Sequence, residues 1–216
     1  MSERTAAPDV SPPSDGVPAE RAARVRLVLL DVDGVLTDNG IYLGDTWGGA
    51  AERPDGAASK PLELKRFDIQ DGLGVKLLVA AGLGVELLSG RESPATDMRA
   101  RELGVRANQV SGGFKLEVAE RILAEHGVDW EDAAVVGDDL ADLPLLRRAG
   151  LAVAVANAVA EVRDVAHWTT RLGGGRGAVR EFAEALLDAR GQRERVIEAY
   201  ERSRTPGDAG EMSRAG

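Results

Sequence analysis

Short apolar runs followed by polar or glycine residues recur along the chain and predict the strands of a buried sheet. The first covers residues 25–30, where only Arg26 is polar, and later ones cover residues 85–88, 133–136 and 151–155. Runs of this length, rich in Val, Leu and Ala, are typical of strands that are buried on both faces of a parallel sheet.

The segments between these runs carry apolar residues at helical spacing. Residues 116–123 and 179–187 each place their apolar side chains on one helix face. A weaker pattern predicts a helix over residues 93–103, with Ser93 as its N-cap and Gly104 as its stop. Because strands and helices alternate, the sequence predicts an α/β fold, with a Rossmann-like parallel sheet and helices on both of its faces.

One segment departs from this alternation and predicts a β-hairpin over residues 40–67. Its two arms, residues 40–43 and 62–67, alternate in the manner of strands, and the tip of residues 44–61 is rich in Gly, Pro and Ala. Trp47 in the tip has two interpretations: it packs on the hairpin, or it covers a ligand or a neighbouring subunit. The hairpin is expected to form a flap, and no insertion is large enough for a cap domain.

A further helix is predicted directly after the hairpin, over residues 72–81. Asp71 stands before Gly72 and is the candidate N-cap of this helix. The alternative is that the Asp71 carboxylate contacts a substrate.

The length of 216 residues suits a single folded domain with additional segments at both ends. Residues 1–23 are rich in Pro, Ser, Ala and acidic residues, and they predict a disordered tail. The folded domain is expected over residues 24–190, and residues 191–216 are expected to form a C-terminal helix and a second disordered tail.

The composition excludes several classes of function. The net charge of −9 argues against binding to nucleic acid or to anionic membranes, and an anionic substrate must be held by local positive charge. The chain has no cysteine, which excludes disulfides, thiolate metal sites and thiol nucleophiles. No run approaches the roughly 20 apolar residues of a membrane span, and the N-terminus lacks the apolar segment of a secretory signal. A cytoplasmic location is the expectation. Because aromatic residues make up only 4% of the chain, the core is expected to consist of Leu, Val and Ala.

Acidic residues follow two of the predicted strands. Asp31 and Asp33 leave the first strand, and Gly137 followed by Asp138 comes after the strand over residues 133–136. Open α/β sheets bind ligands at the carboxyl ends of their strands. Three carboxylates there predict a hard oxygen site for Mg²⁺, with Co²⁺ or Mn²⁺ as alternatives. Of the first two aspartates, one can attack phosphorus and the other can transfer protons, but the residues alone do not distinguish them.

Candidates for holding a phosphoryl group follow another strand. Ser89 and the backbone N–H of Gly90 stand at a strand-to-helix turn, where a hydroxyl and free amides can bind phosphate oxygens. Lys115 opens a later helix. It is either a solvated helix lysine or a cation that balances the charge of phosphate and nucleophile.

Four sequence motifs, in the order in which they occur along the chain, resemble those of the haloacid dehalogenase-like superfamily of aspartate-nucleophile phosphatases. They are DVDGVLTD from Asp31, then Ser89, then Lys115, then GDDLAD from Gly137. The segments SGRESP and GGGRGAVRE are further similar to a capless subfamily, the 3-deoxy-D-manno-octulosonate 8-phosphate phosphatases. The resemblance covers about residues 25–188.

The resemblance implies a phosphomonoester hydrolase that acts through an aspartyl-phosphate. It implies that Asp31 is the nucleophile and Asp33 the general acid and base. Mg²⁺ is then held by the Asp31 carboxylate, the Asp33 backbone carbonyl and Asp138.

Five further residues receive roles from the same resemblance. Ser89, the Gly90 amide and Lys115 hold the transferring phosphoryl group. Asp139 and Asp142 orient water and neighbouring groups around the metal.

The implied substrate is 3-deoxy-D-manno-octulosonate 8-phosphate, a sugar acid with a carboxylate and a phosphate. Arg91, Arg99 and Arg176 are the candidate partners for those groups, because an arginine fork binds both oxygens of a carboxylate. For Arg99 the alternative is a solvated helix face.

The resemblance also implies assembly and leaves other functions open. The hairpin of residues 40–67 is expected to mediate a homotetramer, and the loop of residues 173–177 is expected to help cover a site. Alternatives are a phosphatase of a nine-carbon sugar-acid phosphate, a broad small-sugar phosphatase that the long hairpin tip opens, and an inactive assembly or regulatory module.

Overall fold

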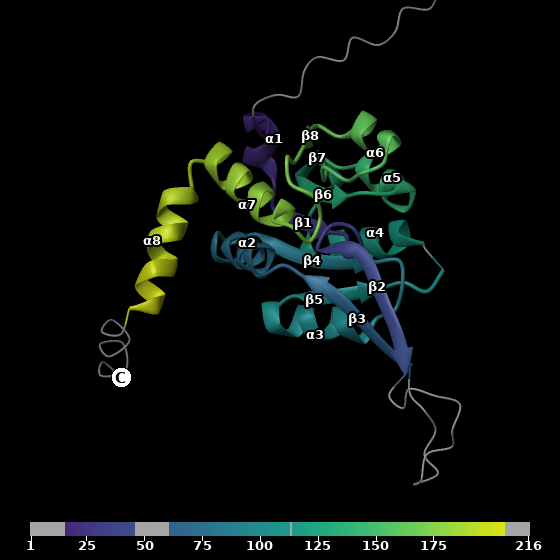
Figure 1. Ribbon diagram of the computed structural model, residues 1–216. Helices are drawn as coiled ribbons and strands as arrows, with labels where there is room; N and C mark the ends of the chain where they lie inside the picture. The colour runs from purple at the N-terminus through teal and green to yellow at the C-terminus, as the bar shows by residue number, and fades with distance from the viewer. Residues whose placement is uncertain (1–15, 46–60, 113, 206–216) are drawn as a thin grey trace, which may run out of the picture.

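Six parallel strands form the central sheet of the computed structural model, which describes residues 16–45, 61–112 and 114–205 (Figure 1). The spatial order of the strands is β5-β4-β1-β6-β7-β8. They are β1 (Leu27–Leu30), β4 (Gly84–Ser89), β5 (Arg106–Gln109), β6 (Ala133–Gly137), β7 (Leu151–Ala154) and β8 (Trp168–Thr169). All four strands predicted from apolar runs are present, and the Rossmann-like sheet is confirmed.

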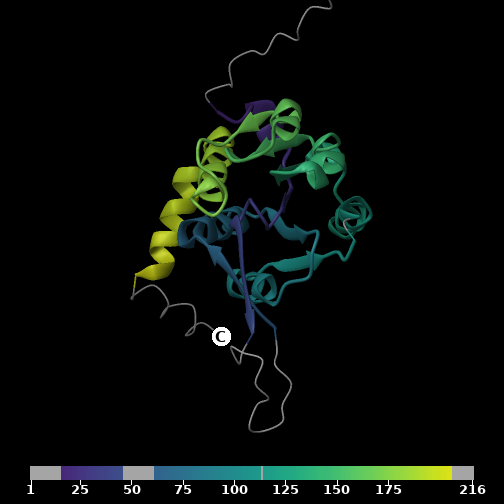
Figure 2. The same cartoon turned by 45° about the vertical axis from the view of Figure 1, so that its right-hand side comes forward.

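Helices cover both faces of this sheet, as predicted (Figures 1 and 2). One face carries α2 (Ile69–Ala80), α3 (Pro94–Leu103) and α7 (Ala178–Ala189), with α1 (Ala19–Arg24) and α8 (Arg193–Arg204) packed on them. The other carries α4 (Lys115–His126), α5 (Leu143–Leu146) and α6 (Ala160–Val165). Two short 3₁₀ turns are η1 (Trp130–Asp132) and η2 (Leu140–Asp142). Within the described residues, every helix is too short or too polar to cross a membrane.

The register of the central strands places their ends at one edge of the sheet. Leu30, the last residue of β1, pairs with Leu87 of β4 and with Val136 of β6. All four residues of β1 are buried, in a core built mainly of Leu, Val and Ala. The residues that follow Leu30, Leu87 and Val136 therefore emerge side by side.

The hairpin forms a separate antiparallel pair of strands, β2 (Thr37–Asp45) and β3 (Pro61–Phe67). Ile41 pairs with Lys65, and Tyr42 pairs with Leu64. The hairpin flap is thus confirmed, and none of the described residues forms a cap domain. Residues 46–60 of the predicted tip, including Trp47, lie outside the described residues, whereas Gly44, Asp45 and Pro61 belong to the two strands.

Two elements differ from expectation. Helix α1 lies within the segment expected to be a tail, and Val17 and Ala22 are buried, so the folded part begins before residue 24. Strand β5 was missed because its sequence, RANQ, contains no apolar run. It pairs with β4, where Arg106 also binds the buried Glu86.

The interpretation of Asp71 as an N-cap of its own helix was wrong. Helix α2 begins three residues earlier than predicted, and its N-cap is Asp68, which accepts a hydrogen bond from the Gln70 amide at 2.8 Å. Asp71 is buried inside α2 and accepts hydrogen bonds from the amides of Gly177 (3.1 Å) and Arg180 (3.0 Å). It therefore caps the start of α7, where the N-cap residue itself is a glycine. By contrast, Ser93 and Gly104 bound α3 as predicted.

Candidate active site

Three buried carboxylates meet at the edge where the central strands end. Asp31 follows β1, Asp138 follows the neighbouring β6, and Asp142 closes η2. One oxygen from each lies within 4.8 Å of the other two. The structure thus brings together Asp31 and Asp138, as expected for residues that follow parallel strands, and adds Asp142 as a direct neighbour.

Lys115, the first residue of α4, joins this cluster. Its Nζ lies 2.6 Å from Asp31 Oδ1 and 2.8 Å from Asp142 Oδ1, and the side chain is only 4% exposed. Burial lowers the pKa of Lys115, but the two carboxylates outweigh that effect and hold it above its ordinary value. The interpretation as a solvated helix lysine is therefore excluded.

The Asp31 and Asp138 carboxylates have properties that fit the binding of a divalent cation. Burial, with the Asp142 charge second, raises the pKa of Asp31 well above its ordinary value. Burial and the nearby carboxylates raise the pKa of Asp138 to about 7. Oδ1 of Asp138 is also buried and accepts no hydrogen bond from the described residues. A cation would let both carboxylates ionise and would occupy that open oxygen.

The two other acids of this loop are held by the protein itself. Asp142 accepts hydrogen bonds from Lys115 through Oδ1 and from the Asp138 amide through Oδ2, the latter at 3.0 Å. Asp139 accepts a hydrogen bond from the Leu140 amide at 2.7 Å and forms a capping box with Asp142 at the start of η2. Because both Asp142 oxygens already have donors, Asp142 fits the role of a neighbour better than that of a metal ligand.

Ser89 and Gly90, at the end of β4, lie beside Asp33 and Lys115. Ser89 Oγ donates to the Arg91 carbonyl at 3.0 Å and is 3.5 Å from Asp33 Oδ2. If Gly90 were replaced by alanine, the added Cβ would lie 3.4 Å from the Lys115 side chain. The strand-to-helix turn therefore faces the same space as Asp33 and Lys115.

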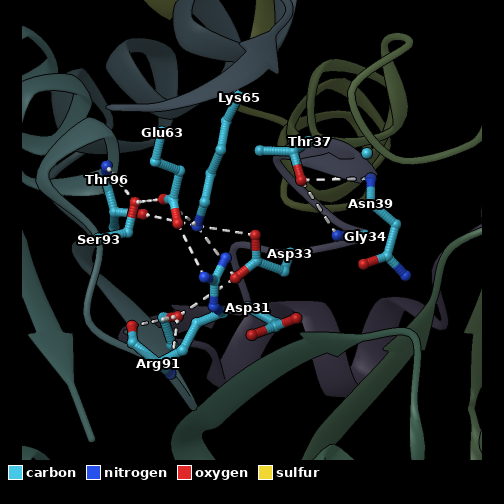
Figure 3. A network of polar contacts seen from close by, with 12 residues as sticks. Asp31, Asp33, Gly34, Thr37, Asn39, Glu63, Lys65, Arg91, Ser93 and Thr96 are labelled. Atoms are coloured by element: carbon cyan, nitrogen blue, oxygen red, sulfur yellow. Dashed lines mark hydrogen bonds and ion pairs between the residues drawn. The ribbon is translucent and has the colours of Figure 1, made fainter. Parts of the chain in front are cut away.

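Two charged residues of the hairpin, which sequence reasoning missed, also reach this space (Figure 3). Lys65 Nζ lies 2.8 Å from Asp33 Oδ1, and Glu63 lies 2.7 Å from Arg91 Nη2 and accepts a hydrogen bond from Ser93 Oγ. The alternation in β3 places Glu63 and Lys65 on one face, but it does not tell which face points inward.

The three candidate arginines lie in different surroundings. Arg91 is beside the site, paired with Glu63. Arg176 is 64% exposed and lies 3.4 Å from Asp38 Oδ2. Arg99 is buried, where it donates to the Asp68 carbonyl at 2.8 Å. Its ion pair is with Glu102 at 2.8 Å, and the structure does not bring Arg99 together with Asp31, Asp33 or Asp138. Because Arg99 is buried, its interpretation as a solvated residue is also wrong.

The loop of residues 173–177 packs directly against the turn after β1. Asn157 bridges the two: its Nδ2 donates to the Gly34 carbonyl at 3.0 Å, and its Oδ1 accepts from the Gly174 amide at 2.6 Å. The contact is so close that a Cβ at Gly174 would lie 1.8 Å from the Gly34 oxygen. Asn157 was not singled out in the sequence, because it carries no motif of its own.

The turn itself is held from within by Thr37. The Thr37 hydroxyl accepts hydrogen bonds from the amides of Gly34 and Asn39, both at 3.3 Å (Figure 3). The Asn39 side chain in turn donates to Asp138 Oδ2 at 3.4 Å. These contacts fix the path of the chain that carries Asp31 and Asp33.

Comparisons with known proteins agree with this geometry. A profile of the haloacid dehalogenase-like hydrolases matches residues 110–177. The 3-deoxy-D-manno-octulosonate 8-phosphate phosphatase of Yersinia pestis is 36% identical over 168 residues, which are 78% of this chain and 82% of that protein.

Solved structures show the same likeness. The crystal structure of the Yersinia pestis phosphatase has a TM-score of 0.72 and 37% identity, and the match covers 82% of this chain and 88% of that one. A phosphatase of the same name from Moraxella catarrhalis was solved in complex with a magnesium ion, a phosphate ion and KDO. It has a TM-score of 0.71 and 32% identity, over 84% of this chain and 97% of that one.

Proposed function

The chain belongs to the haloacid dehalogenase-like hydrolases and is a phosphatase, and from this premise we propose that it releases phosphate from 3-deoxy-D-manno-octulosonate 8-phosphate. The observation that carries the proposal is the likeness, over four fifths of the length, to phosphatases of that substrate. The cluster of Asp31, Asp138 and Lys115 at the carboxyl edge of the sheet supports it.

In the proposed reaction Asp31 is the nucleophile. One Asp31 oxygen attacks phosphorus, the bond from phosphorus to the sugar oxygen breaks, and Asp33 gives that oxygen its proton. In the second step Asp33 takes a proton from water, the water oxygen attacks phosphorus, and the Asp31 carboxylate leaves. The contacts support this order, because Asp31 is embedded beside Lys115 while Asp33 stands apart from that cluster.

The positive charge that faces the phosphoryl group is expected to come from Lys115 and a metal ion. Asp31, Asp138 and the backbone carbonyl of Asp33 are the proposed ligands of Mg²⁺, which supplies positive charge toward the phosphoryl oxygens when bound. Ser89, the Gly90 amide and Lys115 are proposed to hold the remaining oxygens. Magnesium in the Moraxella catarrhalis relative supports this choice of ion.

The sugar acid is proposed to lie over the hairpin side of the site. Arg91 is the proposed partner of its carboxylate, since it lies next to Ser89 and Gly90. Arg176 is proposed to act from the loop of residues 173–177.

Assembly into a homotetramer through the hairpin is also proposed. Tyr42, Leu62 and Leu64 share the face of the hairpin that points away from Glu63, and they are 66%, 43% and 54% exposed. Three large apolar side chains on one exposed face are typical of a surface that another protein covers.

The first experiment measures phosphate release from 3-deoxy-D-manno-octulosonate 8-phosphate, arabinose 5-phosphate and a nine-carbon sugar-acid phosphate, with Mg²⁺ and with EDTA. The proposal expects metal-dependent turnover and a strong preference for the eight-carbon acid. Equal or better turnover of the others would keep the aspartate chemistry but overturn the substrate.

The nucleophile is tested separately with Asp31→Asn, with Asp164→Asn, an exposed aspartate of α6, as the matched control. Asp31→Asn is expected to lose at least about 1,000-fold in kcat, since removing a covalent nucleophile removes the step itself. Metal-dependent phosphate release that survives this change would overturn the proposed role of Asp31.

A further inference from the structure

A lysine of the hairpin is buried against the proposed general acid and base. The Lys65 side chain is fully buried, and its Nζ lies 2.8 Å from Asp33 Oδ1 and 3.1 Å from Asp33 Oδ2. It also donates to Thr96 Oγ1 of α3 at 3.2 Å, and Glu63 Oε1 is 3.9 Å away (Figure 3). Two elements, β3 and α3, therefore hold this ammonium group in place.

Lysine is scarce in this chain, which makes the placement informative. Only four of the 27 basic residues are lysines, at positions 60, 65, 76 and 115. Lys115 contacts Asp31, and Lys65 contacts Asp33. A buried ammonium is costly unless it is paired and hydrogen-bonded, so each proposed catalytic aspartate has its own buried lysine.

The contacts of Asp33 show what the lysine does for it. Apart from Lys65, its nearest described side-chain partner is Ser89 Oγ, at the long distance of 3.5 Å from Oδ2. Oδ1 has no other described partner. The direction of the Asp33 carboxylate therefore depends mainly on Lys65.

We propose that Lys65 is a positioning residue that aims Asp33 at the oxygen of the leaving sugar. This inference rests on the proposed function and adds a hairpin residue to the machinery of that site. Proton transfer by a positioned carboxylate depends steeply on its geometry. The hairpin thus orients the acid that the sheet carries.

The proposal predicts a dependence on the leaving group. A sugar leaves as an alkoxide unless Asp33 protonates it, whereas 4-nitrophenolate leaves without a proton. Loss of Lys65 should therefore impair phosphoryl transfer from a sugar phosphate and spare transfer from 4-nitrophenyl phosphate. A general loss of structure would impair both.

The experiment compares kcat/KM on the eight-carbon sugar-acid phosphate and on 4-nitrophenyl phosphate for Lys65→Met, Lys65→Arg and the control Lys76→Met. Lys76 lies in α2 and has no ion pair among the described residues. For Lys65→Met we expect a loss of about 100-fold on the sugar phosphate, the low end for general acid catalysis, and about threefold or less on the aryl phosphate. Lys65→Arg should recover part of the loss, and Lys76→Met should match the wild type.

Thr96→Val serves as a second variant if Lys65→Met does not fold, with thermal unfolding as the check. It removes only the hydroxyl that holds Lys65. Its kcat/KM should fall on the sugar phosphate and not on 4-nitrophenyl phosphate, and by less than that of Lys65→Met. Equal losses on both substrates, or no loss on either, would overturn the role of Lys65. A wild-type chain that releases phosphate from neither substrate would instead overturn the proposed function.

Discussion

Glu63 Oε2 lies 2.7 Å from Arg91 Nη2, so the arginine that follows Ser89 and Gly90 already has a carboxylate partner in the free protein. Arg91 is nevertheless 39% exposed, and a guanidinium has five N–H donors. In the proposed function, a substrate carboxylate would share Arg91 with Glu63, and Glu63 would fix the orientation in which the arginine meets that substrate.

Arg91→Met is expected to change substrate preference more than overall activity. The loss of a charge-assisted pair costs about 1.5–3 kcal/mol, which corresponds to about 10–150-fold in kcat/KM for the eight-carbon sugar acid. Arabinose 5-phosphate has no carboxylate and should lose about threefold or less. Steady-state kinetics on both substrates checks this, with Arg101→Met on α3 as the control. The same loss on both substrates would contradict the carboxylate role.

The metal-free protein is expected to lose stability through Asp138 as pH rises from about 4 to about 7. Its folded-state pKa, about 7, is above the ordinary value of 3.8. The folded chain therefore keeps a proton that the unfolded chain releases, and stability falls with rising pH. A difference of about three pH units corresponds to about 4 kcal/mol over the whole range.

Urea unfolding in EDTA at pH 5–8 measures this effect as the difference between the wild type and Asp138→Asn. As pH rises, the free energy of unfolding of the wild type should fall relative to that of Asp138→Asn. Mg²⁺ should stabilise the wild type most at pH 8, where Asp138 is ionised, and the variant little. A difference that is constant over this range would show that Asp138 is ionised throughout in the free protein.

Gly174→Ala is expected to lower both stability and kcat. A Cβ there would lie 1.8 Å from the Gly34 oxygen and 2.8 Å from the Thr37 oxygen, so the loop must move. Overpacking of this kind costs about 1–3 kcal/mol, and the displaced loop carries Arg176. Gly44→Ala is the control, because nothing lies within 4 Å of a Cβ at that glycine. Equal unfolding midpoints for the two variants would contradict the close approach.

The double variant Leu62→Glu, Leu64→Glu is expected to dissociate the proposed tetramer. Two buried carboxylates without partners would make an apolar contact between hairpins unfavourable. Light scattering after size exclusion gives the particle mass. Val79→Glu, at an exposed apolar position of α2, should leave the mass unchanged. A wild type that is monomeric, or a double variant with the wild-type mass, would reject assembly through this face.

The sequence predicted the parts of the site that follow apolar strands. Asp31, Ser89 and Asp138 each come directly after a buried run, and parallel strands of one sheet end at the same edge. The order of β4, β1 and β6 then brings these residues together. Lys115 needed the family resemblance, because its helix alone is compatible with a solvated side chain.

The parts that the sequence did not predict depend on contacts between distant segments. Asp71 caps a helix that begins more than 100 residues later, and no local signal distinguishes it from the N-cap of its own helix. Glu63 and Lys65 share one face of β3, and Leu62 and Leu64 share the other. That pattern ordinarily places the apolar face inward, whereas here the charged face meets the site.

This inverted alternation in β3 sets a limit on how the strand can change during evolution. Successive side chains of a strand point to opposite faces, so a single inserted or deleted residue would exchange the two faces. Leu64 or Arg66 would then stand where Lys65 meets Asp33, and the apolar surface would lose its leucines at the same time. Changes of length within Pro61–Phe67 are therefore compatible with activity only in steps of two residues.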